Sequence, residues 1–126
     1  MNPVTGLSLG RIVIGAAALA SPELAGKMFR LDPGANPQLP YMTRMFASRE
    51  IALGAATLAS RGGAKRALIA VGMAVDGADA FAGYDAGATG AVSPATSKFL
   101  VLPAAGAVIA GLFGLVRRGK KKVIED

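Results

Sequence analysis

The chain has 126 residues, which is room for one domain. Hydrophobic residues make up 52% of it, charged residues only 17%, and the mean hydropathy is +0.46. Soluble chains carry about 25% charged residues, so this balance indicates that lipid forms part of the solvent around the protein. The 17 glycines agree with that interpretation, because small residues let membrane helices approach closely.

The sequence contains no Cys, no His and no Trp. Zinc, haem and iron–sulfur sites therefore lose their usual ligands, and a histidine general base is excluded. We predict no catalytic residues, no metal ligands and no cofactor. A protein without enzymatic activity is favoured over an enzyme.

The first apolar segment runs from about Pro3 to Ala20. Ser21-Pro22-Glu23 then predicts the start of a short helix that reaches about Leu31, because Ser is favoured as an N-cap and Pro at the first helical position. This helix mixes apolar and charged side chains, which predicts that it lies at the membrane interface. A loop at residues 32–37, rich in Pro and Gly, follows it.

Three further helices are predicted, over residues 40–60, residues 64–84 and residues 93–116. In the last of them, residues 99–116 hold no charged side chain, which is a clean membrane span. The sequence thus predicts an all-α fold, a four-helix transmembrane bundle over residues 1–117 with a short interfacial helix between the first two helices. Residues 118–126 are predicted to be a basic, disordered C-terminal tail.

Positive residues are distributed unevenly between the two ends of such a bundle. One end carries Arg61, Lys65, Arg66, Arg117, Arg118, Lys120, Lys121 and Lys122, and the other carries Lys27, Arg30 and Lys98. The positive-inside rule then places both termini in the cytoplasm, in a bacterial cytoplasmic (inner) membrane. We expect the basic tail to contact anionic lipid rather than nucleic acid, because it directly follows an apolar span.

Two alternatives to this topology stay open. Ala18-Leu19-Ala20 is similar to a signal-peptide cleavage site, so residues 1–20 could be removed from the mature protein. Against this, residues 1–10 carry no positive side chain, and cleavage would break the loop-charge pattern. A soluble helical bundle is the second alternative, because charges interrupt three of the four predicted spans.

The charges inside these spans are the candidate site. They are Arg11 in the first span, Arg44, Arg49 and Glu50 in the second, and Asp76 and Asp79 in the third. Each costs about 2.5–3.5 kcal/mol at the centre of a span, so the second helix should insert only with partners. Counting depth at about 1.5 Å per residue predicts that Arg49 meets Asp76 and Arg44 meets Asp79, with Arg11 at a similar level.

Two interpretations of this arginine–carboxylate network are open. Ionisable groups within a membrane indicate a ligand site or a proton path. Paired charges can also serve only to hold helices together. The network is therefore predicted to be either ligand-binding or structural.

Several short runs resemble one family. They are Gly10-Arg11-Ile12-Val13-Ile14-Gly15, Asn36-Pro37-Gln38-Leu39-Pro40, Arg44-Met45-Phe46-Ala47-Ser48-Arg49-Glu50-Ile51-Ala52-Leu53-Gly54 and Val75-Asp76-Gly77-Ala78-Asp79. Together they resemble the small four-helix membrane proteins grouped as domain of unknown function 4267, and more distantly DoxX-like proteins. The resemblance covers most of residues 5–116. It implies a four-helix membrane bundle and brings no activity with it.

These observations predict a small polytopic membrane protein, namely an accessory or structural subunit with a buried arginine–carboxylate network. The alternative is a small carrier or binder of a lipid, a quinone or an anion that uses the same network. The expected partners are the lipid bilayer and either a second copy or another membrane protein. No nucleic-acid partner is expected.

Overall fold

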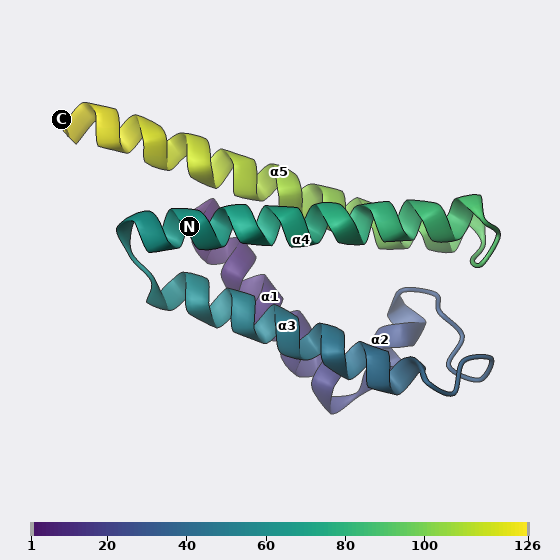
Figure 1. Cartoon of the computed structure of the whole chain (residues 1–126). Coiled ribbons are helices and arrows are strands. Elements are labelled where there is room, and N and C mark those ends of the chain that lie inside the picture. Colours follow the sequence, from purple (N-terminus) through teal and green to yellow (C-terminus); the bar gives the residue numbers. More distant parts are fainter. Residues whose placement is uncertain (1, 126) are drawn as a thin grey trace.

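The computed structural model describes the backbone of residues 2–125 and the side chains of residues 2–120. Every regular element in that part of the chain is a helix (Figure 1). In chain order the helices are α1 (Pro3–Ala20), α2 (Pro22–Met28), α3 (Leu39–Ala59), α4 (Gly62–Ala88) and α5 (Pro94–Glu125). The predicted all-α class and the short second helix are confirmed.

Local signals explain several of the helix ends. The Asn2 side chain accepts a hydrogen bond from the Val4 amide at 2.8 Å and so caps α1. Ser21 occupies the N-cap position of α2, although its hydroxyl makes no capping hydrogen bond. Gly62 has a φ of 57°, in the left-handed region that glycine adopts without strain. This conformation lets α4 fold back on α3 after a connection of only two residues.

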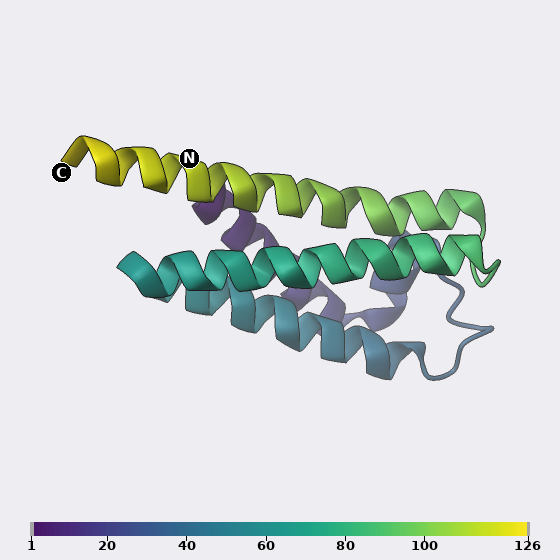
Figure 2. The same cartoon turned by 45° about the horizontal axis from the view of Figure 1, so that its top comes forward.

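The four long helices form two pairs. α1 packs along α3, and α4 packs along α5, while contacts between the two pairs are fewer (Figures 1 and 2). Glycines permit the close approach within the first pair. A Cβ atom on Gly54 would lie 2.6 Å from the Ser8 carbonyl oxygen, and one on Gly15 would lie 2.8 Å from the Ala47 carbonyl oxygen.

The chain order brings several connections to the same end of the bundle. At one end Val4 packs against Gly114, and the Arg118 guanidinium donates to the Gly62 carbonyl at 3.5 Å. The start of α1, the α3–α4 turn and the late part of α5 therefore lie together. At the other end the Thr96 hydroxyl donates to the Arg30 carbonyl at 3.2 Å, which joins the start of α5 to the segment after α2.

Three helices within the described residues, α1, α4 and α5, are long and apolar enough to cross a membrane. The prediction of a four-helix transmembrane bundle is therefore wrong. The predicted span that does not qualify is α3, whose 21 residues include Arg44, Arg49 and Glu50. Its few large apolar side chains do not offset the cost of inserting three charges. α3 nevertheless lies alongside α1 (Figure 1).

The apolar side chains face outward to an unusual degree. Phe81 is 69% exposed, Leu102 is 67% exposed and Phe113 is 62% exposed. The buried hydrophobic residues are few and mostly small: Val4, Ala18, Ala47 and Ile69. Large exposed apolar surfaces mark contact with a partner or a membrane. Together with the three apolar helices, this surface indicates a membrane protein.

The last helix crosses the boundary that the sequence predicted at residue 117. The backbone of α5 is helical as far as Glu125. Lys121 and Lys122, two of the basic residues predicted to meet anionic lipid, have side chains outside the described residues. The contact of this segment with anionic lipid stays a prediction.

Candidate functional site

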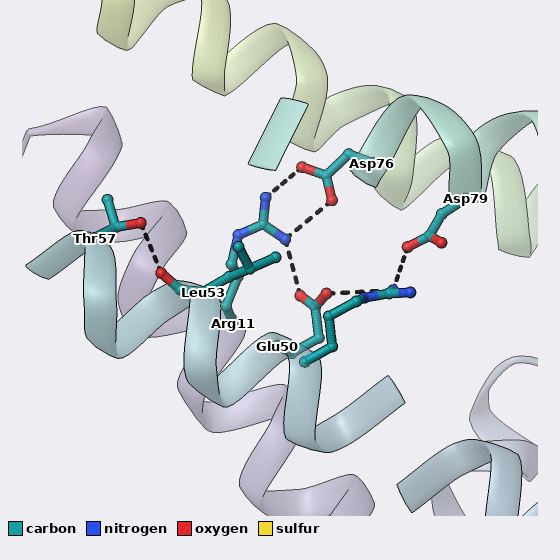
Figure 3. A network of polar contacts seen from close by, with 7 residues as sticks. Arg11, Glu50, Leu53, Thr57, Asp76 and Asp79 are labelled. Carbon is teal, nitrogen blue, oxygen red and sulfur yellow. Dashed lines mark hydrogen bonds and ion pairs between the residues drawn. The ribbon is translucent and has the colours of Figure 1, made fainter. Parts of the chain in front are cut away.

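Arg11 of α1 lies between carboxylates from two other helices (Figure 3). Its Nη1 donates to Glu50 Oε2 at 2.9 Å and to Asp76 Oδ1 at 3.0 Å, and its Nη2 donates to Asp76 Oδ2. The two parallel bonds to Asp76 are the geometry for which a planar guanidinium is suited. Since Glu50 belongs to α3 and Asp76 to α4, one side chain ties the two helix pairs together.

These three groups are deeply buried. Arg11 keeps 7% of its surface exposed, Glu50 keeps 6% and Asp76 keeps 4%. Charges buried to this extent are tolerated only when they are paired and hydrogen-bonded. The ion pairs supply that pairing, so the three residues depend on one another.

Arg49 and Asp79 extend the network toward its exposed side. Arg49 Nη2 donates to Asp79 Oδ2 at 2.6 Å and lies 3.5 Å from Glu50 Oε1. The Arg49 side chain is 38% exposed and the Asp79 side chain 33%. This outer pair is therefore only partly buried, unlike the inner group of Arg11, Glu50 and Asp76.

Both pairings predicted from depth are wrong. Asp76 is bound by Arg11 instead of Arg49, and Asp79 is bound by Arg49 instead of Arg44. Arg44 is exposed, and the described residues give it no ion pair. The structure thus brings together five of the six predicted site residues. Counting residues along a helix gives the height of a side chain in the bundle. It does not give the rotation of the helix about its axis, and this rotation decides which partner the side chain meets.

Sequence reasoning missed the residues that make room for the Arg11 side chain. A Cβ atom on Gly72 would lie 3.1 Å from Arg11 Nη2, and one on Gly54 would lie 3.3 Å from Arg11 Cβ. Both glycines therefore lie directly against this arginine. Gly54 falls within the run that resembles the four-helix family, which is the only signal in the sequence that could have singled it out.

A cavity of about 670 Å³ lies beside the network. Arg11, Glu50, Asp76 and Asp79 contribute to its wall. The rest of the wall is mostly apolar, comes from all five helices and includes Ile14, Phe29, Met42, Phe46, Leu100 and Pro103. An apolar hollow of this size with a few convergent polar groups is typical of a small-molecule site.

The formal charges of the network do not cancel. Two arginines, Arg11 and Arg49, face three carboxylates, Glu50, Asp76 and Asp79, which leaves one negative charge in excess. One oxygen from each carboxylate lies within 4.8 Å of the others, a spacing that could hold a metal ion. An arginine nitrogen already contacts each carboxylate, however, so a metal ion would have to compete with two guanidinium groups.

Two buried polar atoms of the network lack hydrogen-bond partners. Glu50 Oε1 accepts no hydrogen bond, and Arg49 Nε donates none. Most buried polar groups in proteins are hydrogen-bonded, so these two atoms can each take a further partner.

A scan against protein-family models, a search of curated proteins and a search of solved structures found no match to the chain. The resemblance to the small four-helix family stays a prediction. What the site can bind follows from its geometry and its charge.

Proposed function

We propose that the protein binds or carries an amphipathic small molecule within the membrane. The apolar body of the ligand would fill the 670 Å³ cavity, and its polar head group would meet the network. The observation that carries this proposal is an apolar cavity lined at one place by Arg11, Glu50, Asp76 and Asp79. Protein interiors are normally close-packed, so a network that only held helices together would not need such a hollow.

A structural role for the network is the second candidate function. Arg11 joins α1, α3 and α4, and this supports a protein that acts as an accessory subunit whose charges only hold its helices together. The two candidates differ in one respect, since only a binding protein needs the cavity to stay open. A substitution that fills the cavity without disturbing the network therefore separates them.

Gly10 offers that substitution. Gly10 lines the cavity, and a Cβ atom built on it meets no atom within 4 Å, so leucine should extend into the hollow without a clash. We expect Gly10→Leu to weaken binding about tenfold or more, which corresponds to about 1.4 kcal/mol. The measurement is native mass spectrometry of the protein in nanodiscs, titrated with single-chain amphiphiles that differ in their head groups.

Gly77→Leu is the matched control. A Cβ atom on Gly77 also meets no atom within 4 Å, but Gly77 does not line the cavity. This variant should bind every amphiphile as the unaltered protein does. If Gly10→Leu binds all of them equally well too, the cavity is not the binding site and the structural role is favoured.

We also propose a location and an orientation. In a bacterial cytoplasmic membrane, the end of the bundle with the α3–α4 turn would face the cytoplasm and contact anionic lipid. The basic side chains at that end support this: Arg61, Lys65, Arg66, Arg117, Arg118 and Lys120. The opposite end carries fewer basic side chains, namely Lys27, Arg30 and Lys98, with the exposed Arg44 in the second turn of α3.

Single cysteines test this orientation cleanly, because the chain has no cysteine of its own. Gly63→Cys lies at the start of α4, and Ala91→Cys lies in the connection after it; both positions are exposed. A maleimide that cannot cross membranes should label Ala91→Cys in intact spheroplasts, and Gly63→Cys only after lysis. The reverse pattern would place the basic end outside the cytoplasm.

A further inference from the structure

We infer that the cavity takes a ligand with a singly charged cationic head group that donates hydrogen bonds, such as a protonated primary amine. This inference rests on the proposed function and gives the chemical class of the ligand. Glu50, Asp76 and Asp79 are the groups that would recognise it.

The first argument for a cationic head group is the excess negative charge of the network. Three carboxylates face two guanidinium groups, so the site holds one uncompensated negative charge beside an apolar wall. Such a charge is costly in apolar surroundings, and a single cation removes the cost. An anionic head group would instead raise the excess to two negative charges, which favours a cation over the anion of the earlier alternative.

A second, independent observation is the Glu50 oxygen that accepts no hydrogen bond. This side chain is more than nine-tenths buried and lines the cavity, and its Oε1 accepts no hydrogen bond. Its other oxygen is already bound by Arg11. Arg49 Nη2 forms an ion pair with Oε1 at 3.5 Å but donates its hydrogen bond to Asp79 instead. A head group with an N–H donor would satisfy Oε1.

The spacing of the carboxylates fits the same head group. One oxygen from each of Glu50, Asp76 and Asp79 lies within 4.8 Å of the others. A primary ammonium carries three N–H donors and can therefore reach more than one of these oxygens at once. A quaternary ammonium has the charge but no donor, so it should bind less tightly.

The arginines are poorly placed to hold an anion. Arg11 directs Nη1 and Nη2 at Glu50 and Asp76, and Arg49 directs Nη2 at Asp79. The buried Nε of Arg49 has no acceptor, but Arg49 does not line the cavity. The guanidinium groups thus bind the carboxylates, and they leave Glu50 Oε1 able to accept a hydrogen bond from a ligand.

The apolar wall suits a cation as well. Phe29 and Phe46 both line the cavity. Aromatic faces attract cations, and the Arg49 guanidinium already lies 5.1 Å from the centre of the Phe46 ring. Hydrophobic side chains around these rings would take the alkyl body of an amphiphilic amine.

Four probes, each with a linear chain of twelve carbon atoms, test the inference in nanodiscs of zwitterionic lipid. Dodecylamine is cationic with donors, dodecyltrimethylammonium is cationic without them, dodecanol is a neutral donor, and dodecanoate is an anion. Specific binding is the binding to the unaltered protein minus the binding to Gly10→Leu. This difference excludes probe that has only dissolved in the lipid. We expect dodecylamine to bind about tenfold more tightly than dodecanoate, with the other two between them.

Glu50→Gln removes the excess charge and should abolish the preference for dodecylamine over dodecanol. Glu23→Gln makes the same chemical change at an exposed position of α2 and should leave the preference intact. Asp79→Asn is the second test variant, because this residue is one-third exposed and outside the inner group around Arg11. It should weaken the preference even if Glu50→Gln fails to fold.

The outcomes separate the inference from the proposed function. If dodecanoate binds as tightly as dodecylamine, or if Asp79→Asn and a folded Glu50→Gln both keep the preference, the inference is wrong. The proposed function still stands in that case. If no probe shows binding that depends on Gly10, the proposed function fails and the inference fails with it.

Discussion

Arg11→Met is expected to destabilise the bundle by about 3–5 kcal/mol, because it leaves Glu50 and Asp76 buried without their shared cation. Methionine is of comparable length and apolar, so lost charge pairing should dominate over lost packing. The measurement is unfolding of the protein in mixed micelles by a denaturing detergent, followed by circular dichroism. A change below about 1 kcal/mol, as expected of an exposed ion pair, would show that the inner group does not hold the helices together.

Two further variants identify the cause of this loss. Arg44→Met removes an arginine that is exposed and has no ion pair within the described residues, so it should cost little. The triple variant Arg11→Met, Glu50→Gln, Asp76→Asn removes the charges of all three buried groups and should recover much of the stability. Removing one partner alone is costly because it leaves a buried charge uncompensated, and the triple variant leaves no such charge among these three residues.

Gly54→Leu is expected to separate α1 from α3 and to destabilise the protein by about 1–3 kcal/mol or more. Even a Cβ atom at this position would lie 2.6 Å from the Ser8 carbonyl oxygen, and backbone cannot move aside as a flexible side chain can. The same atom would also press on Arg11, so the loss should extend to the network. The same detergent unfolding experiment measures it.

Gly77→Leu again serves as the control, since the space around Gly77 is open. Replacing a glycine within a helix by leucine should stabilise it by up to about 1 kcal/mol. The two variants make the same chemical change in opposite surroundings. If both raise the stability, α1 and α3 do not approach as closely as Gly54 indicates.

The helices could be predicted because their signals are local. The apolar segments and the prolines at residues 3, 22 and 94 mark where helices begin, and the structure agrees within a few residues. The predicted number of membrane-spanning helices is wrong, because the prediction counts α3 among the apolar segments and relies on an even number of spans to fit the loop charges. The three charges of α3 are evident in its sequence, but the prediction takes their insertion cost to be offset by partners in the bundle.

The members of the site could be predicted, but their partners could not. Charged residues inside apolar segments are conspicuous, and five of the six proved to lie together. Pairing depends on which way each helix face points, and that is set by close contacts such as those of Gly54 and Gly72 with Arg11. The cavity could not be predicted from the sequence either, because its wall combines residues from all five helices.

The bidentate bond between Arg11 and Asp76 spans 65 residues of sequence, and this separation bears on how the protein is made. Chains emerge from the ribosome N-terminal end first, so α1 and α3 are synthesised before Asp76 exists. During that interval Arg11 has Glu50 as its only buried carboxylate partner, and α3 is the helix least suited to enter lipid alone. Final assembly therefore waits for α4, whose arrival completes the pairing of Arg11 and retains α3 in the bundle.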